Sequence, residues 1–164
     1  MDAVRETDNT QSMKAGPNPG LLRPPIVFLC AILLGIAVNR AWPLHFVSPS
    51  VRLLGPLVTA FAVVLFLLSY REFRAAGTPV RGSERTNTIV RTGPYRFSRN
   101  PIYVAFILFV LGLSVWLNNL WLLVTLVPAV GIIAMVVIPR EERFLGRNFN
   151  DQYSSYKDRV RRWL

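Results

Sequence analysis

The chain has 164 residues, of which 52% are hydrophobic, and it carries a formal net charge of +10 at pH 7. The apolar residues are gathered in long runs that are uncharged except for Arg40 near the end of the first, and such runs would have no solvated face, which excludes an ordinary soluble domain. The single cysteine, Cys30, lies inside one of these runs. It excludes an intramolecular disulfide and indicates a packing residue rather than a nucleophile.

Residues 1–23 are polar and contain both acidic and basic side chains. This composition is neither that of a signal peptide nor that of an arginine-rich transit peptide that lacks acids. It predicts a disordered N-terminal segment on the cytoplasmic side. Residues 24–164 contain no internal repeat, and we expect them to form one membrane domain.

Four apolar runs are long enough to cross a bilayer, whose core requires roughly 20 apolar residues per helix. They cover residues 24–42, 53–70, 102–117 and 120–138. Asn118 and Asn119 form a tight polar turn between the last two runs, and Pro128 is expected to kink the fourth. Gly35 and Gly112 are suited to close contact between helices. The sequence therefore predicts an all-α, polytopic membrane protein with four transmembrane helices.

The basic residues are distributed unevenly among the connections between these runs. They concentrate before the first run, in residues 71–100 and after residue 139, whereas the turn at residues 118–119 has none. Under the positive-inside rule, both termini and residues 71–100 face the cytoplasm. Topology and contact with anionic lipid headgroups then account for the positive charge, so we expect membrane lipids and no nucleic acid as partners.

The tail, residues 140–163, has apolar and aromatic positions spaced by three and four residues. This spacing predicts an amphipathic helix, with a bend near residues 148–150. We expect the helix to lie along the cytoplasmic membrane interface, with its aromatic side chains directed into the membrane or packed on the spans.

A basic, turn-forming segment leads into the third run. Gly93-Pro94 predicts a turn, and Asn100-Pro101 is typical of a helix N-cap followed by proline at the first helical position. Because the third and fourth runs form a hairpin, Asn100 and Glu141 are expected on the same side of the membrane.

The residues near that side have two interpretations when they are taken alone. Glu141 and Glu142 suit the first turn of the tail helix, where they would pair with Arg140 or Arg143. Tyr95 and Tyr103 suit the aromatic belt at a membrane interface. The other interpretation is a site in which carboxylates, arginines and tyrosines converge.

A family resemblance favours the site. Residues 93–103, the hairpin, and residues 141–145 and 149–156 closely resemble the integral-membrane isoprenylcysteine carboxyl methyltransferases and phospholipid methyltransferases. The resemblance covers about residues 85–164 and implies S-adenosylmethionine as cofactor, bound at the cytoplasmic face. It also implies methyl transfer to a lipophilic acceptor that enters from the bilayer.

Carried over residue by residue, the resemblance implies a set of site residues. The implied cofactor contacts are Asn87, Thr88, Ile89, Val90, Tyr95, Asn100, Pro101, Ile102, Tyr103 and Glu141. Glu142 and Arg140 are the expected catalytic residues, and no metal is required. These residue types suit the cofactor, because arginines or helix amides hold a carboxylate, a glutamate holds an ammonium, and tyrosine faces hold a cation or adenine.

Two positions depart from the family pattern. Asn100 stands where many members have histidine, and Val137 stands where the prenylcysteine enzymes place a substrate-binding arginine. A carboxylate, an amine, a thiol and a phenol all remain open as the acceptor group. Two other functions are also open: an NADPH-dependent membrane reductase of similar fold, and a non-catalytic scaffold or transporter. A transporter is expected to bury charge at mid-membrane, and the apolar runs have none there.

Overall fold

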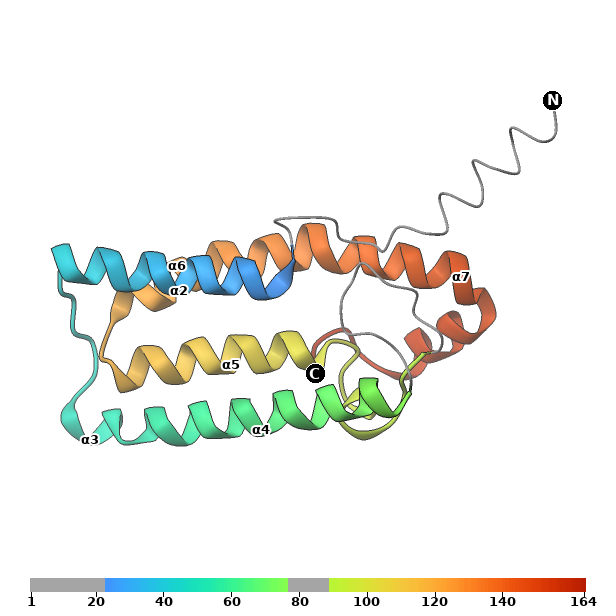
Figure 1. Ribbon diagram of the computed structural model, residues 1–164, viewed down its shortest axis with the longest axis horizontal. Helices are drawn as coiled ribbons and strands as arrows, with labels where there is room; N and C mark the ends of the chain where they lie inside the picture. Colours follow the sequence, from blue (N-terminus) through green and yellow to red (C-terminus); the bar gives the residue numbers. More distant parts are fainter. Residues whose placement is uncertain (1–22, 77–88) are drawn as a thin grey trace, which may run out of the picture.

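The computed structural model describes residues 23–76 and 89–164, which are helical and contain no strand (Figure 1). The N-terminal segment up to residue 22 and the expected cofactor contacts Asn87 and Thr88 lie outside the described residues. Long helices run side by side and form most of the molecule. They are α2 (Pro24–Ala41), α4 (Leu54–Ala75), α5 (Pro101–Trp116) and α6 (Leu120–Ile132).

Shorter elements connect these helices. The helix α3 (Pro49–Arg52) precedes α4, and the 3-10 helix η2 (Gly93–Arg96) precedes α5. After α6, the chain passes through the π-helix η3 (Ile133–Val137) directly into α7 (Ile138–Arg159). The all-helical prediction is therefore confirmed for the part of the chain that the structure describes.

Within residues 23–76 and 89–164, three helical stretches are long and apolar enough to cross a membrane: Pro24–Ala41, Pro49–Ala75 and Leu120–Phe149. They correspond to three of the four predicted spans. The third predicted span, α5, is apolar but has 16 residues. At a rise of about 1.5 Å per residue, it is about 24 Å long, against about 30 Å for a bilayer core. The structure thus gives an integral membrane bundle, and the count of four spans stays a prediction.

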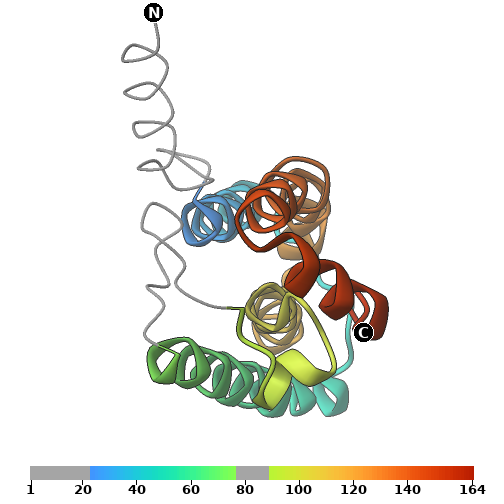
Figure 2. The same ribbon diagram turned by 90° about the vertical axis from the view of Figure 1, so that its right-hand side faces the viewer.

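The bundle is built from helix pairs. α4 packs along α5, α2 packs along α6, and α5 contacts α6 (Figure 2). A Cβ atom added to Gly112 of α5 would lie 2.6 Å from the backbone nitrogen of Thr59 in α4. A Cβ at Gly35 of α2 would lie 2.9 Å from the Leu122 side chain in α6. Both glycines therefore permit close helix contact, as predicted.

Buried side chains of α2, α5, α6 and the following helical turns form one apolar core. Its buried members are Phe28, Tyr103, Val110, Leu122, Leu126, Ile133, Val137 and Ile138. Large apolar side chains also remain exposed along the helices, among them Leu57, Phe61 and Val127. Exposed apolar helix faces suit a lipid environment.

The predicted turn at Asn118-Asn119 is confirmed. Asn118 has a φ of 49°, a left-handed conformation that asparagine tolerates better than most residues. Its Oδ1 accepts hydrogen bonds from the backbone amides of Phe46 and Val47, at 2.9 and 3.0 Å. The Asn119 side chain caps α6 by accepting from the Trp121 amide at 3.0 Å.

The boundary between the fourth span and the tail helix differs from the prediction. We expected two helices, at residues 120–138 and 140–163, but the chain is helical without interruption from Leu120 to Phe149. The π-helix lies directly before α7, and the helix continues through Pro139, which has no N–H to donate.

The bend predicted near residues 148–150 is confirmed, because Phe149 has non-helical dihedral angles (φ −134°, ψ 22°). α7 then turns back and ends at Arg159, so the helix does not reach residue 163 as predicted. Residues 160–164 return toward the N-terminal end of α5, where Trp163 packs against the apolar core (Figures 1 and 2).

Candidate functional site

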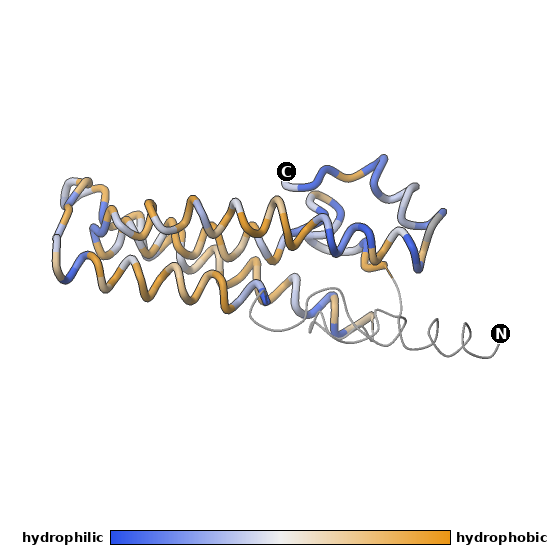
Figure 3. Tube along the Cα trace, turned by 90° about the horizontal axis from the view of Figure 1, so that it is seen from above, coloured by the Kyte–Doolittle hydropathy of each residue, from blue (hydrophilic) through white to orange (hydrophobic). Residues whose placement is uncertain are grey.

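The polar residues of the molecule gather at the end of the bundle where α7 bends. Hydrophobic residues cover the helices along most of their length, and hydrophilic residues follow α7 and the C-terminal segment (Figure 3). The end of α4, η2, the start of α5 and the residues after α7 meet there. The candidate site lies at this end.

The turn predicted at Gly93-Pro94 forms the 3-10 helix η2. Gly93 has a φ of +57°, a left-handed conformation that favours glycine, and a Cβ there would also lie 2.8 Å from the Glu72 side chain at the end of α4. The hydroxyl of Thr92 donates to Glu72. The chain before α5 is thereby fastened to the end of α4.

Tyr95 of η2 is buried beneath this turn. Its ring meets Phe73 of α4 edge to face, with 5.2 Å between centroids. Burial, and then the nearby Tyr156, Glu141 and Glu72, raise the pKa of the Tyr95 hydroxyl well above its ordinary value. Tyr95 therefore stays a neutral phenol at physiological pH.

Asn100 is the N-cap residue of α5, and Pro101 is its first residue, as predicted. However, the Asn100 side chain makes no capping hydrogen bond with α5. Of the two roles expected for this side chain, the helix cap is therefore wrong, and the cofactor contact stays a prediction. Its Nδ2 donates instead to the main-chain carbonyl of Arg162, at 3.0 Å. The tertiary structure explains this choice of partner, because the returning C-terminal segment places the Arg162 carbonyl beside the Asn100 side-chain amide.

Tyr103 and Glu141 form the central contact of the site. The Tyr103 hydroxyl donates to Glu141 Oε1 at 2.7 Å, and this bond joins the first turn of α5 to the first turn of α7. Tyr103 is 8% exposed. The charge of Glu141 also contributes to the raised pKa of the buried Tyr95.

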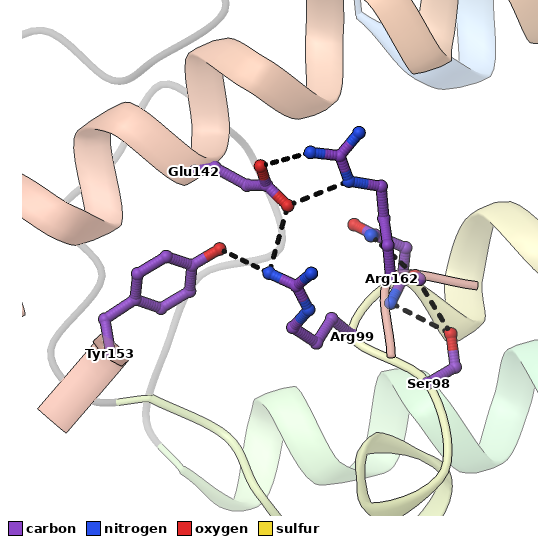
Figure 4. A network of polar contacts seen from close by, with 6 residues as sticks. Ser98, Arg99, Glu142, Tyr153 and Arg162 are labelled. Atoms are coloured by element: carbon purple, nitrogen blue, oxygen red, sulfur yellow. Dashed lines mark hydrogen bonds and ion pairs between the residues drawn. The ribbon is translucent and has the colours of Figure 1, made fainter. Parts of the chain in front are cut away.

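Glu142, the next residue of α7, is bound by two arginines (Figure 4). Arg162 donates to both carboxylate oxygens, from Nη2 at 2.7 Å and from Nε at 3.1 Å. Arg99 Nη1 donates to Glu142 Oε1 at 3.1 Å and to the Tyr153 hydroxyl at 3.3 Å. Arg99 Nε is buried and has no hydrogen-bond partner among the described residues.

The alternative in which Glu142 pairs with Arg140 or Arg143 is wrong. Arg143 Nε donates to the carbonyl of Pro139 in its own helix, at 3.2 Å. Arg140, an expected catalytic residue, is exposed, and the polar network around Glu142 is built without it. Helix geometry explains this result, because Glu142 faces α5 and the C-terminal segment.

The second half of α7 forms hydrogen bonds with η2 and with the residues that precede it. The Tyr156 hydroxyl donates to the Tyr95 carbonyl at 2.8 Å. The Arg91 guanidinium donates to the carbonyl of Gln152 at 2.5 Å and lies 5.9 Å from the centre of the Tyr156 ring. Burial raises the pKa of Tyr156 to about 12, and it raises the pKa of Tyr153 as well.

The structure brings together most of the sequence-predicted residues that it describes. Tyr95, Asn100, Tyr103, Glu141 and Glu142 surround the meeting point of η2, α5 and α7. Val90 and Pro101, which are close to these residues in sequence, are buried. Ile89 and Ile102 are partly buried. Ile102 packs against the apolar core. Which of these residues contact a cofactor stays a prediction.

Three residues of the network were not singled out from the sequence: Arg99, Tyr153 and Arg162. Arg99 lies in the motif before α5, and Tyr153 lies in the aromatic stripe of the tail, so both carried a usable signal. Arg162 is one of 19 lysines and arginines, and no sequence pattern distinguishes it. Among the residues described here, no group of three or more His, Cys, Asp or Glu could hold a metal ion.

These features define a helical integral membrane protein with a polar, arginine- and tyrosine-rich site at one end of its bundle. Residues 51–152 match the family model described as phospholipid methyltransferase. The chain belongs to this family, and the resemblance to it is confirmed. The match begins in α3, upstream of the residues that carried the resemblance.

Two relatives show how far the similarity extends. The chain is 31% identical over 143 residues to the cobalt-zinc-cadmium resistance protein CzcN of Cupriavidus metallidurans, which covers 86% of this chain and 60% of CzcN. It is 35% identical over 63 residues to an uncharacterized protein of Haemophilus influenzae, which covers 38% of this chain and 100% of that protein.

Proposed function

We propose that this protein is a membrane methyltransferase that transfers the methyl group of S-adenosylmethionine to a lipophilic acceptor. Membership of the phospholipid methyltransferase family supports the reaction class. The observation that carries the site assignment is the hydrogen bond between Tyr103 and Glu141, next to the buried Tyr95. The products would be the methylated acceptor and S-adenosylhomocysteine.

The residues at this end of the bundle fit the cofactor's functional groups. The Glu141 carboxylate suits its ammonium, and the rings of Tyr95 and Tyr103 suit a cation or the adenine ring. Arg99 has a buried Nε that lacks a partner in the described parts of the chain, and a guanidinium N–H suits a carboxylate. The set holds cationic, anionic and aromatic groups together.

The protein's own contribution would be binding, alignment and exclusion of water. Bound S-adenosylmethionine supplies an already activated methyl group, so the chain needs no metal or covalent intermediate for the transfer. Tyr103 fixes the orientation of the Glu141 carboxylate through its hydroxyl. The Tyr95 phenol is neutral at physiological pH, as an ordinary tyrosine is, and burial raises its pKa further, so its ring adds no negative charge beside the carboxylate.

Glu142 was expected to be catalytic, and its contacts favour a different role. Two guanidinium groups bind its carboxylate, which is 16% exposed. Three charge-assisted hydrogen bonds occupy this carboxylate and hold it in one orientation. We assign Glu142 to the positioning of α7, and Arg140, which is exposed, to the membrane surface.

The charge distribution supports a cytoplasmic orientation of the site. Exposed basic residues surround this end of the bundle: Arg71, Arg74, Arg96, Arg140, Arg143, Arg147, Lys157, Arg159 and Arg161. Under the positive-inside rule, this distribution favours a cytoplasmic site and cytoplasmic termini, beside anionic lipid headgroups. A lipophilic acceptor would then reach the site from the bilayer, along the exposed apolar faces of the helices.

The test is methyl transfer by the purified full chain in lipid nanodiscs. We expect label from methyl-labelled S-adenosylmethionine to pass to a component of a membrane lipid extract, and Glu141→Gln to reduce the transfer. Asp158→Asn is the matched control, because Asp158 is an exposed acid of the same helix. No transfer, together with no calorimetric binding of S-adenosylhomocysteine, would overturn the proposal. Consumption of NADPH with the same extract would support a reductase instead.

A further inference from the structure

The chain after α7 closes a ring of contacts around the site. Residues 160–164, here called the C-terminal strap, are not helical and return to the start of α5. The Arg99 amide donates to the Arg161 carbonyl at 2.9 Å, and the Ser98 hydroxyl donates to the Arg162 carbonyl at 3.5 Å. With the Asn100 contact described above, three successive residues before α5 bond to the strap.

Arg162 is the strap residue whose side chain forms an ion pair with α7. Its Nε and Nη2 donate to the two oxygens of Glu142, which is the fork geometry that arginine makes with a carboxylate. Its main-chain carbonyl accepts from the Asn100 side chain. Arg162 therefore binds α7 through its guanidinium and the start of α5 through its backbone (Figure 4).

The contact between Arg162 and Glu142 matters because the preceding residue of α7 is Glu141. Successive residues of a helix point about 100° apart, so the direction of Glu142 determines the direction of Glu141. A Glu142 held by Arg99 and Arg162 restricts the rotation of α7 about its axis. Glu141 then stays directed at the Tyr103 hydroxyl, 2.7 Å away.

The charges also favour a positioning role for Arg162. Arg99 is 10% exposed in its side chain and Glu142 is 16% exposed, so this pair is largely removed from water, whereas Arg162 is 40% exposed. A carboxylate bonded through both oxygens is fixed in orientation, whereas one bonded to Arg99 alone would keep rotational freedom. Arg162 supplies the second and third bonds to Glu142.

We infer that Arg162 is a positioning residue of the site, which orients Glu141 through Glu142 and so sets the affinity for S-adenosylmethionine. This inference rests on the proposed function. It gives residues 160–164, which lie outside the part that matches the family model, a role in the site.

The experiment measures calorimetric binding of S-adenosylhomocysteine to the full chain in nanodiscs, with thermal unfolding as the check on folding. We expect Arg162→Ala to weaken binding about tenfold or more, as the loss of a residue that orients a ligand group typically does. Arg162→Lys keeps the charge without the fork, so it should recover part of the affinity. Arg159→Ala is the matched control, because it removes an exposed arginine near the strap and should leave binding unchanged.

Arg162→Ala in a Glu141→Gln background distinguishes a positioning role from a general loss of stability. If Arg162 acts through Glu141, Arg162→Ala should have a much smaller effect when the Glu141 charge is already gone. An equal effect in both backgrounds would overturn the inference, as would unchanged affinity in folded Arg162→Ala. If Arg162→Ala does not fold, Arg162→Lys carries the same comparison. Absence of binding by the unchanged protein would overturn the proposed function, and this inference with it.

Discussion

The hydroxyl of Tyr103 lies 2.7 Å from Glu141 Oε1, across 38 positions of sequence. The bond connects the first turn of α5 to the first turn of α7, at the polar end of the bundle. Because the donor is a neutral phenol and the acceptor is a carboxylate, the bond is charge-assisted and strongly directional. It fixes a negative charge next to the aromatic rings of the site.

The first prediction concerns this pair. Glu141→Gln keeps the size of the side chain and removes its charge, so S-adenosylhomocysteine binding should weaken by about 1.5–3 kcal/mol. Tyr103→Phe keeps the ring and the Glu141 charge, and should cost about 0.5–1.5 kcal/mol. Calorimetry measures both. Unchanged affinity in folded Glu141→Gln would leave Glu141 with a purely structural role.

The second prediction concerns Asn100, whose amide donates to the Arg162 carbonyl. Histidine has a ring N–H that can replace this donor, so Asn100→His should remain active, with the pH profile of the unchanged enzyme. Asn100→Leu has no donor and should lose cofactor affinity. A large rate increase in Asn100→His that follows one deprotonation near pH ~6.5 would place residue 100 at the proton-transfer centre and contradict the positioning role.

The third prediction concerns membrane topology. After replacement of Cys30 by serine, single cysteines at the exposed positions Arg96 and Ser50 should react from opposite sides. Arg96 lies at the basic end, which the positive-inside rule places in the cytoplasm, and Ser50 lies in α3 at the other end. An impermeant thiol reagent added to intact cells should label Ser50→Cys alone. Labelling of Arg96→Cys from outside would reverse the proposed orientation.

The fourth prediction concerns helix packing. A Cβ at Gly112 would lie 2.5 Å from Thr59 Oγ1 and 2.6 Å from the Thr59 backbone nitrogen, so Gly112→Ala must separate α4 from α5. Overpacking of this kind typically costs about 1–3 kcal/mol. At Gly131 the nearest contact is the flexible Met135 side chain at 3.4 Å, so Gly131→Ala should be tolerated. Equal thermal unfolding temperatures for the two variants would contradict the glycine contact.

The fifth prediction concerns alkaline stability. The pKa of Tyr156 is raised from 10.0 to about 12, chiefly by burial. The unfolded chain therefore loses this proton first as the pH rises, and the stability that depends on the neutral phenol is present below pH 10 and lost through pH 12. Tyr156→Phe should flatten the fall in unfolding temperature over this range. Because it also removes the hydrogen bond to the Tyr95 carbonyl, we expect a loss of about 1 kcal/mol at neutral pH.

The fold could be predicted where local composition decides it. The uncharged runs predicted the helices, Asn118-Asn119 predicted the turn, and Asn100-Pro101 predicted the start of α5. The end of the fourth span could not be predicted in this way. A proline usually interrupts a helix, but here the π-helix η3 leads directly into α7, and the helix continues through Pro139.

The candidate site, too, could be predicted from the sequence only in part. The sequence alone determined that Tyr103 and Glu141 lie at one end of a helical hairpin, because the lengths of two apolar runs and a tight turn place both residues there. Only the tertiary structure decided that Glu142 is bound by Arg99 and Arg162 and that Asn100 donates to the strap. Among 19 basic side chains, the choice of partner depends on the path of the chain after the bend at Phe149, which no local pattern of residues encodes.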